Sequence, residues 1–112
     1  MSMQPNTFLN GVPELLVLGI LRDREMYGYE LVQAIRDRTG NDVDFAEGVI
    51  YPLLHALERD GALTSRRQLV NGRARLYYAA TPTGRERFAT LSQHWARLNR
   101  AIAGALGVPS HA

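Results

Sequence analysis

Residues 47–61 read EGVIYPLLHALERDG, and residues 64–80 read TSRRQLVNGRARLYYAA. The first stretch carries apolar side chains at helical spacing and ends in a glycine, so it predicts a helix that ends near Asp60. The second stretch alternates with a period of two around Asn71-Gly72, a dipeptide typical of a two-residue hairpin turn. A short helix followed by a basic β-ribbon is the layout of a winged helix-turn-helix, which indicates double-stranded DNA as the partner.

Two more helices are predicted before this unit. Residues 14–21 are apolar on nearly all sides, and Pro13 fits the first turn, so this helix should be buried on more than one side. A second helix is predicted over residues 28–39, and Gly40 can take the left-handed conformation that ends it. Inside the third helix, Pro52 predicts a bend or a later start of the regular part.

The last predicted helix begins with Thr81 as N-cap and Pro82 as first residue, and it ends at Gly107. Apolar residues recur along it at spacings of three and four, the pattern of a helix that packs lengthwise on another helix. This seam could pack on residues 14–21 of the same chain, but we predict that at least part of it forms a homodimer interface, because the preceding elements already make a small core. The seam consists of Phe88, Leu91, Trp95, Leu98, Ile102 and Ala105, and the predicted interface of Leu15, Leu91, Trp95, Leu98 and Ile102.

The predicted fold class is mainly α with a small β-hairpin (α+β), a winged helix-turn-helix with a long C-terminal dimerisation helix. Four parts are expected along the chain. They are a flexible N-terminal arm over residues 1–11, the DNA-binding domain over residues 12–81, the dimerisation helix over residues 82–107 and a tail over residues 108–112.

Charge is distributed unevenly along the 112 residues. The net charge is +2, but residues 1–61 carry five arginines against ten acids, a net charge of −5, whereas residues 62–112 carry eight arginines against Glu86 alone, a net charge of +7. Four of those eight arginines lie in the hairpin. A solvated surface could account for this separation, but a polyanion would be attracted to the basic side.

Several classes of protein are excluded by the sequence. There is no cysteine, and His55, His94 and His111 lie far apart, so neither a metal site nor a cofactor is expected. Neither a serine in a nucleophile elbow nor a glycine-rich phosphate loop occurs, so we do not expect an enzyme. No apolar run is long enough to span a membrane, and the N-terminus does not resemble a signal peptide, so the cytoplasm is the expected location.

An ordered set of short motifs runs along the chain. It consists of Tyr27-Gly-Tyr-Glu-Leu31, Gly48-Val-Ile-Tyr-Pro-Leu-Leu54, Leu57-Glu-Arg-Asp-Gly61, Ser65, Gly72-Arg-Ala-Arg-Leu-Tyr-Tyr78 and Thr81-Pro-Thr-Gly84. This set resembles the PadR family of bacterial transcriptional regulators, in its short subgroup with a single C-terminal helix, and the resemblance covers roughly residues 13–106. Arg67 departs from the pattern, because many members have tryptophan there, and it adds a positive charge.

The resemblance implies a homodimeric repressor whose third helix enters the major groove while the wing lies on the backbone. The outward residues of that helix are expected at base edges, although Tyr51 could instead be a half-buried core aromatic and His55 plain surface. The wing arginines are expected to position the protein on phosphates. The predicted DNA contacts are Glu47, Gly48, Tyr51, Pro52, His55, Arg66, Arg67, Arg73 and Arg75.

Some similar regulators bind flat aromatic compounds on a tryptophan at the dimer centre, which implies that Trp95 could hold a planar aromatic effector that releases the operator. Alternatively, Trp95 is only an interface anchor. The predicted effector site comprises Trp95, Phe88, Leu91 and Leu18. A winged helix that binds protein or RNA, without a specific operator, is the alternative function.

Overall fold

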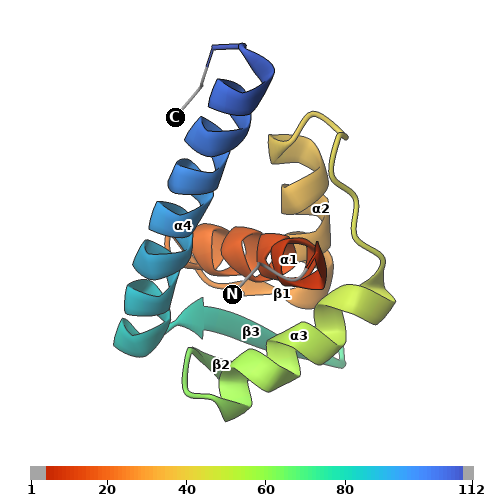
Figure 1. Ribbon diagram of the computed structural model, residues 1–112. Coiled ribbons are helices and arrows are strands. Elements are labelled where there is room, and N and C mark those ends of the chain that lie inside the picture. Colours follow the sequence, from red (N-terminus) through yellow and green to blue (C-terminus); the bar gives the residue numbers. More distant parts are fainter. Residues whose placement is uncertain (1–4, 110–112) are drawn as a thin grey trace.

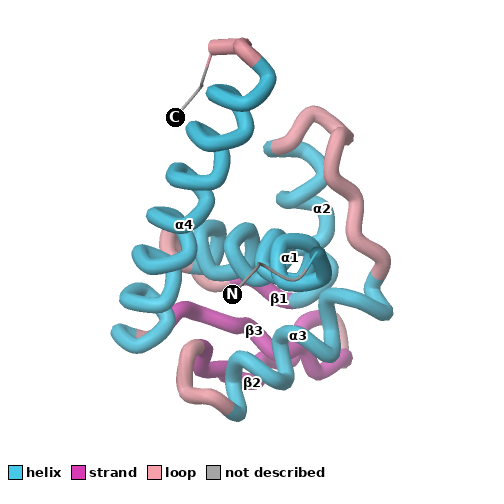
Figure 2. The backbone as a smooth tube through the Cα atoms, in the orientation of Figure 1, coloured by secondary structure: helices cyan, strands magenta, loops and turns pink. Residues whose placement is uncertain are grey.

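Residues 5–109, the part of the chain that the computed structural model describes, fold into four helices and a three-stranded antiparallel sheet (Figures 1 and 2). The mainly helical winged helix-turn-helix with a long C-terminal helix is therefore confirmed. In chain order the elements are α1 (Pro5–Leu21), β1 (Met26–Tyr27), α2 (Gly28–Arg38), α3 (Glu47–Arg59), β2 (Leu63–Val70), β3 (Arg73–Ala80) and α4 (Pro82–Leu106).

The start of α1 differs from the prediction. The helix begins at Pro5, so residues 5–11 of the expected arm are helical and Pro13 lies inside the helix. Proline is tolerated in the first turn, where its missing N–H has no partner to lose, and Pro5 takes that position instead. Residues 1–4 of the expected arm and residues 110–112 of the expected tail lie outside the described residues.

The predicted hairpin is confirmed. Strands β2 and β3 pair antiparallel around Asn71 and Gly72, whose φ angles of 53° and 78° suit the type I′ turn. A third strand, β1, was not predicted, because two residues are too few to show a periodicity. It pairs with β3 through Met26 and Tyr27, so the sheet order is β1-β3-β2.

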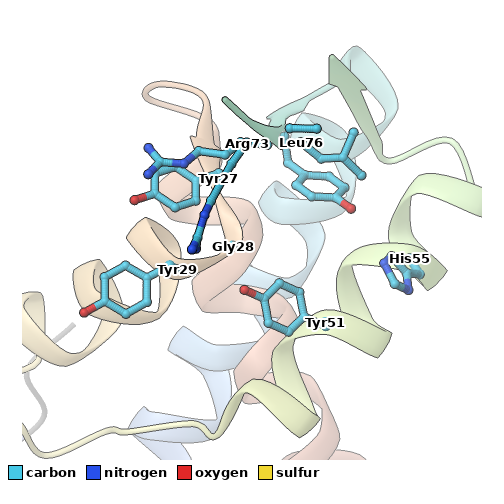
Figure 3. A pocket seen from close by; sticks show the side chains of 10 residues that line it. Tyr27, Gly28, Tyr29, Tyr51, His55, Arg73 and Leu76 are labelled. Atoms are coloured by element: carbon cyan, nitrogen blue, oxygen red, sulfur yellow. The ribbon is translucent and has the colours of Figure 1, made fainter. Parts of the chain in front are cut away.

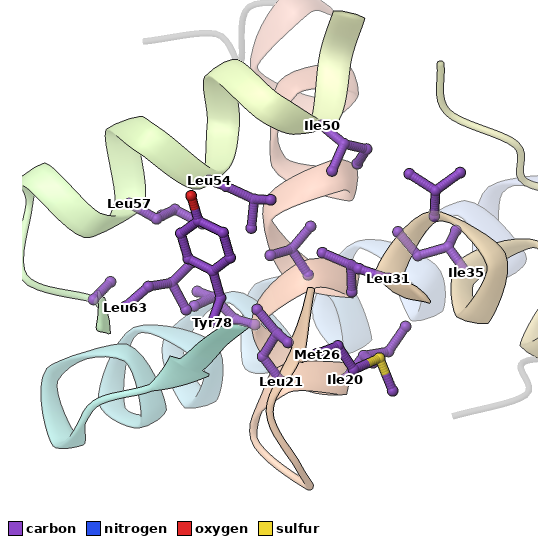
Figure 4. Packing of buried hydrophobic residues seen from close by; sticks show 14 residues of the cluster. Ile20, Leu21, Met26, Leu31, Ile35, Ile50, Leu54, Leu57, Leu63 and Tyr78 are labelled. Carbon is purple, nitrogen blue, oxygen red and sulfur yellow. The ribbon is translucent and has the colours of Figure 1, made fainter. Parts of the chain in front are cut away.

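The core lies between the helices and the sheet. Ile50, Leu54 and Leu57 form the inward face of α3 and point toward Tyr78 of β3 and the buried side chains of α1 and α2 (Figure 4). Pro52 is tolerated inside α3, which begins at Glu47 as one continuous element, so the later start is wrong. This packing fixes the outward face of α3.

Helix α1 is buried on more than one side, as predicted. It lies in the middle of the molecule and contacts α2, β3 and α4 (Figure 1). A second copy is not needed to cover it, because α4 of the same chain does so. The contact is close: a Cβ on Gly19 would lie 2.8 Å from a ring carbon of Phe88.

Helix α4 is fastened to the winged helix at its first turn. Thr81 caps it by accepting a hydrogen bond from the Gly84 N–H at 3.0 Å, as its sequence position predicted. The Thr81 N–H also donates to the Ala62 carbonyl at 3.1 Å, and its hydroxyl donates to the Gly61 carbonyl at 2.6 Å. The turn between α3 and β2 therefore sets the direction in which α4 leaves the domain.

Candidate nucleic-acid interface

The outward face of α3 carries the five predicted base-contacting residues. Glu47, Gly48, Pro52 and His55 are exposed, and Tyr51 is half-buried. An added Cβ on Gly48 would meet no atom within 4 Å, so bare backbone faces open space at the second residue of the helix. This face can approach a flat surface such as a groove floor closely.

Tyr51 is held in place by α2. A Cβ on Gly28 would lie 2.3 Å from Cε1 of the Tyr51 ring, so the ring occupies the space that any other residue at position 28 would fill. Burial, and secondarily the neighbouring Glu47 carboxylate, raise the pKa of Tyr51 above its ordinary value. The tyrosine hydroxyl of this fixed ring can donate a hydrogen bond.

A groove of about 590 Å³ lies between α3 and the wing (Figure 3). It brings together two predicted residues of α3, Tyr51 and His55, and two of β3, Arg73 and Arg75. The groove is also lined by three residues that we did not predict as contacts, Tyr27 of β1 and Gly28 and Tyr29 at the start of α2. The lining residues are Tyr27, Gly28, Tyr29, Tyr51, His55, Arg73, Ala74, Arg75, Leu76 and Tyr78.

Aromatic rings orient the wing at this groove. The Arg75 guanidinium lies 4.4 Å from the centre of the Tyr27 ring, which in turn meets Tyr77 edge-on at 5.5 Å between ring centres. A guanidinium stacked on a ring keeps its in-plane N–H donors available for a phosphate. Two signals could have identified Tyr27: it precedes the predicted helix, and it is part of the first motif quoted above.

The two arginines of β2 are placed differently from those of β3. Arg66 and Arg67 are exposed but do not line the groove. Arg66 forms an ion pair with Glu25, and its hydrogen bonds hold the pKa of that carboxyl below its usual range. Arg67 stands opposite Leu76 in the β2–β3 register. The predicted contacts Arg66 and Arg67 therefore lie outside the groove that contains Tyr51, His55, Arg73 and Arg75.

Similarity to known proteins agrees with the winged helix-turn-helix fold. Residues 17–90 match the model of the transcriptional regulator PadR-like family. The chain belongs to this family. It is 38% identical over 104 residues to the transcriptional regulator Rv3488 of Mycobacterium tuberculosis, a match that covers 93% of this chain and 92% of that protein.

Solved structures give the same result. A PadR family regulator from Eggerthella lenta matches with a TM-score of 0.78 and 29% identity, over 89% of this chain and 87% of that one. A PadR-like regulator from Bacillus cereus matches with a TM-score of 0.74 and 30% identity, over 89% and 96% of the chains. The PadR-like protein described here is a DNA-binding transcriptional regulator and not an enzyme.

The C-terminal two thirds of α4 in this PadR-like regulator have two distinct faces. The face toward the same chain carries small residues, among them Ala96 and the buried Ala103. The larger apolar residues lie one position earlier, about 100° around the helix. This exposed stripe consists of Trp95, Leu98, Ile102 and Leu106, of which Leu98 is half-buried.

The predicted effector residues do not form one exposed site. The prediction that Leu18 lines the effector site is wrong. Its exposed fraction is 0%, because it belongs to the core that α1 forms with the sheet. Phe88 packs against Gly19 on one side and lies under the Arg22 guanidinium, 4.3 Å from the ring centre. Leu91 is partly buried against the core, whereas Trp95 is 42% exposed.

Among residues 5–109, no three histidine, cysteine, aspartate or glutamate side chains are grouped so that they could hold a metal ion. In the same residues, none of the helices combines the length and the apolar character needed to cross a bilayer.

Proposed function

We propose that the protein is a homodimeric repressor that binds a specific operator through α3 and the wing. The observation that carries this proposal is the groove in which Tyr51 and His55 of α3 face Arg73 and Arg75 of β3. A recognition helix beside such a groove can read base edges while the arginines hold the adjoining phosphates. Within the described residues, no carboxylate lies within 4.0 Å of either arginine, so both charges are available.

A second copy of the chain is proposed as the occupant of the α4 stripe. Trp95, Ile102 and Leu106 are 42%, 45% and 69% exposed, and they continue in line with Leu91. A row of exposed apolar side chains at this spacing is typical of helices that pair along their length. Pairing would place two recognition helices for half-sites about 34 Å apart.

Arg73→Ala should weaken binding to all duplexes alike and reduce the salt dependence of the affinity by about one counterion, because a phosphate contact carries no sequence information. Fluorescence anisotropy with labelled duplexes at several salt concentrations measures both effects. Arg100→Ala is the matched control, since it removes the same charge from an exposed position on α4. If the affinity of Arg73→Ala depended on salt as steeply as that of the wild type, the wing would not contact the DNA backbone.

An effector is proposed to release the operator by altering the pairing of the α4 helices at Trp95. A planar aromatic compound that inserts there should quench Trp95 fluorescence at micromolar concentration and lower the affinity for the operator. Because Trp95 is the only tryptophan, the signal reports on this position alone. Quenching without loss of operator affinity would show binding without regulation, and no quenching by any planar compound would exclude the effector.

The decisive test of the function uses a labelled duplex that carries the DNA just upstream of the protein's own gene. Tight binding that resists a random-sequence competitor by about 10³-fold or more, with a steep salt dependence, is the result expected for a specific regulator. Weak binding that the competitor abolishes at this duplex and at the other promoter duplexes tested would instead favour the protein- or RNA-interaction module.

A further inference from the structure

One arginine of the wing is held by partners within the protein. The Arg66 Nε donates to both oxygens of Glu25 at 2.9 Å, and its Nη2 donates to the same carboxylate. Its Nη1 donates to the Gln68 side-chain oxygen at 2.6 Å. One face of the guanidinium lies over the Tyr77 ring, 4.9 Å from its centre. Each of the three guanidinium nitrogens thus donates a hydrogen bond within the protein, and one face of the group lies on a ring.

The Glu25–Arg66 bridge crosses the central strand of the sheet. Glu25 precedes β1, Arg66 lies on β2, and Tyr77 between them belongs to β3. In the register, Arg66 stands opposite Tyr77, which stands opposite Tyr27. The bridge therefore covers the exposed side of Tyr77 and joins the two outer strands at the base of the wing.

Within residues 5–109, the two arginines of β3 differ from Arg66 in having no carboxylate partner. Arg73 and Arg75 point into the groove, and no carboxylate among the described residues pairs with them. A phosphate that approached Arg66 would have to compete with a carboxylate that already accepts from Nε and Nη2. Glu25 would then lie close to the phosphate, and two like charges at close range repel. A contact between Arg66 and DNA would gain little.

We propose that Glu25 is a positioning residue that withholds Arg66 from DNA phosphates and so limits the sequence-independent part of the affinity. The proposal rests on the proposed function, because it presumes that the wing lies on the DNA backbone. Each protein cation that neutralises a phosphate releases about 0.9 of a counterion from B-DNA. The wing carries four arginines, but on this account Arg66 releases none.

The test is a double-mutant cycle on the full chain with a random-sequence labelled duplex, measured by anisotropy over a series of salt concentrations. Arg66→Gln alone should leave the salt slope as in the wild type. Glu25→Gln should steepen the slope by about 0.9 and tighten binding about five- to tenfold in 0.1 M salt, because it frees Arg66. The double variant should return to the wild-type slope and affinity.

Two controls separate this effect from others. Glu86→Gln removes one negative charge from an exposed position on α4 and should leave the slope unchanged. Far-UV circular dichroism checks that each variant is folded, which is expected because Glu25 and Arg66 lie at the surface.

Three results would overturn the inference alone while the wild type still binds duplex with a steep slope. The first is a salt slope in Arg66→Gln that is shallower than in the wild type. The second is a salt slope in Glu25→Gln that equals that of the wild type. The third is a double variant whose salt slope stays as steep as that of Glu25→Gln. A wild-type protein without salt-dependent duplex binding would instead overturn the proposed function, and this inference with it.

Discussion

Gly84→Ala is expected to lower the free energy of unfolding by about 2–4 kcal/mol, at the upper end of what overpacking costs. A Cβ at this position would lie 2.1 Å from the Ala62 carbonyl oxygen and 3.0 Å from its carbon. These are backbone atoms, and the same oxygen accepts the Thr81 N–H. To make room, the first turn of α4 would have to move away from the α3–β2 turn.

Gly104→Ala is the matched control for this prediction. Gly104 lies in the same helix, but an added Cβ there would meet no atom within 4 Å. Alanine is the better helix former, so this variant should be more stable than the wild type by up to about 1 kcal/mol. Urea unfolding followed by circular dichroism measures both variants, and equal stabilities would contradict the close approach at Gly84.

The sequence predicted the elements better than their contacts. Asn71-Gly72 identified the hairpin, and Thr81, Pro82 and Gly107 identified the ends of α4, because each of these positions depends on local backbone geometry. Strand β1 was missed because it exists only through its pairing with β3. The close approach of Gly84 to Ala62 was missed for the same reason, since it joins distant parts of the chain.

The candidate site shows the same division. The sequence grouped the outward residues of α3 with the wing arginines, and the groove contains two of each, Tyr51 and His55 with Arg73 and Arg75. The pattern could not distinguish Arg66 from them, because its partner Glu25 lies 41 residues away. Pairing across the sheet, rather than residue type, distinguishes Arg66 from Arg73 and Arg75.

The seam of α4 was predicted as one continuous row. In the structure its first part, Phe88 and Leu91, packs on the core, while Trp95 and Ile102 are turned outward. Helix α1 crosses α4 rather than running along it, so it covers only part of the row (Figure 1). The later part of the row stays exposed and can be covered by a second copy.

Ile102→Glu is expected to convert the dimer to a monomer and to weaken binding to a duplex with two half-sites by about 10²–10³-fold. The substitution would place an unpaired carboxylate in the proposed helix pair, where burying a charge costs several kcal/mol. The protomer itself should stay folded, because Ile102 is 45% exposed within it. Light scattering coupled to size exclusion reports the mass, and anisotropy reports the affinity.

Ala101→Glu distinguishes a face-specific effect from a general effect of charge on α4. Ala101 is exposed and lies one position earlier, about 100° around the helix from Ile102. The Ala101→Glu variant should therefore remain dimeric and bind the duplex as the wild type does. If Ile102→Glu were also dimeric, the stripe would not be the interface. If both variants were monomeric, the contact would extend beyond the stripe to the neighbouring face of the helix.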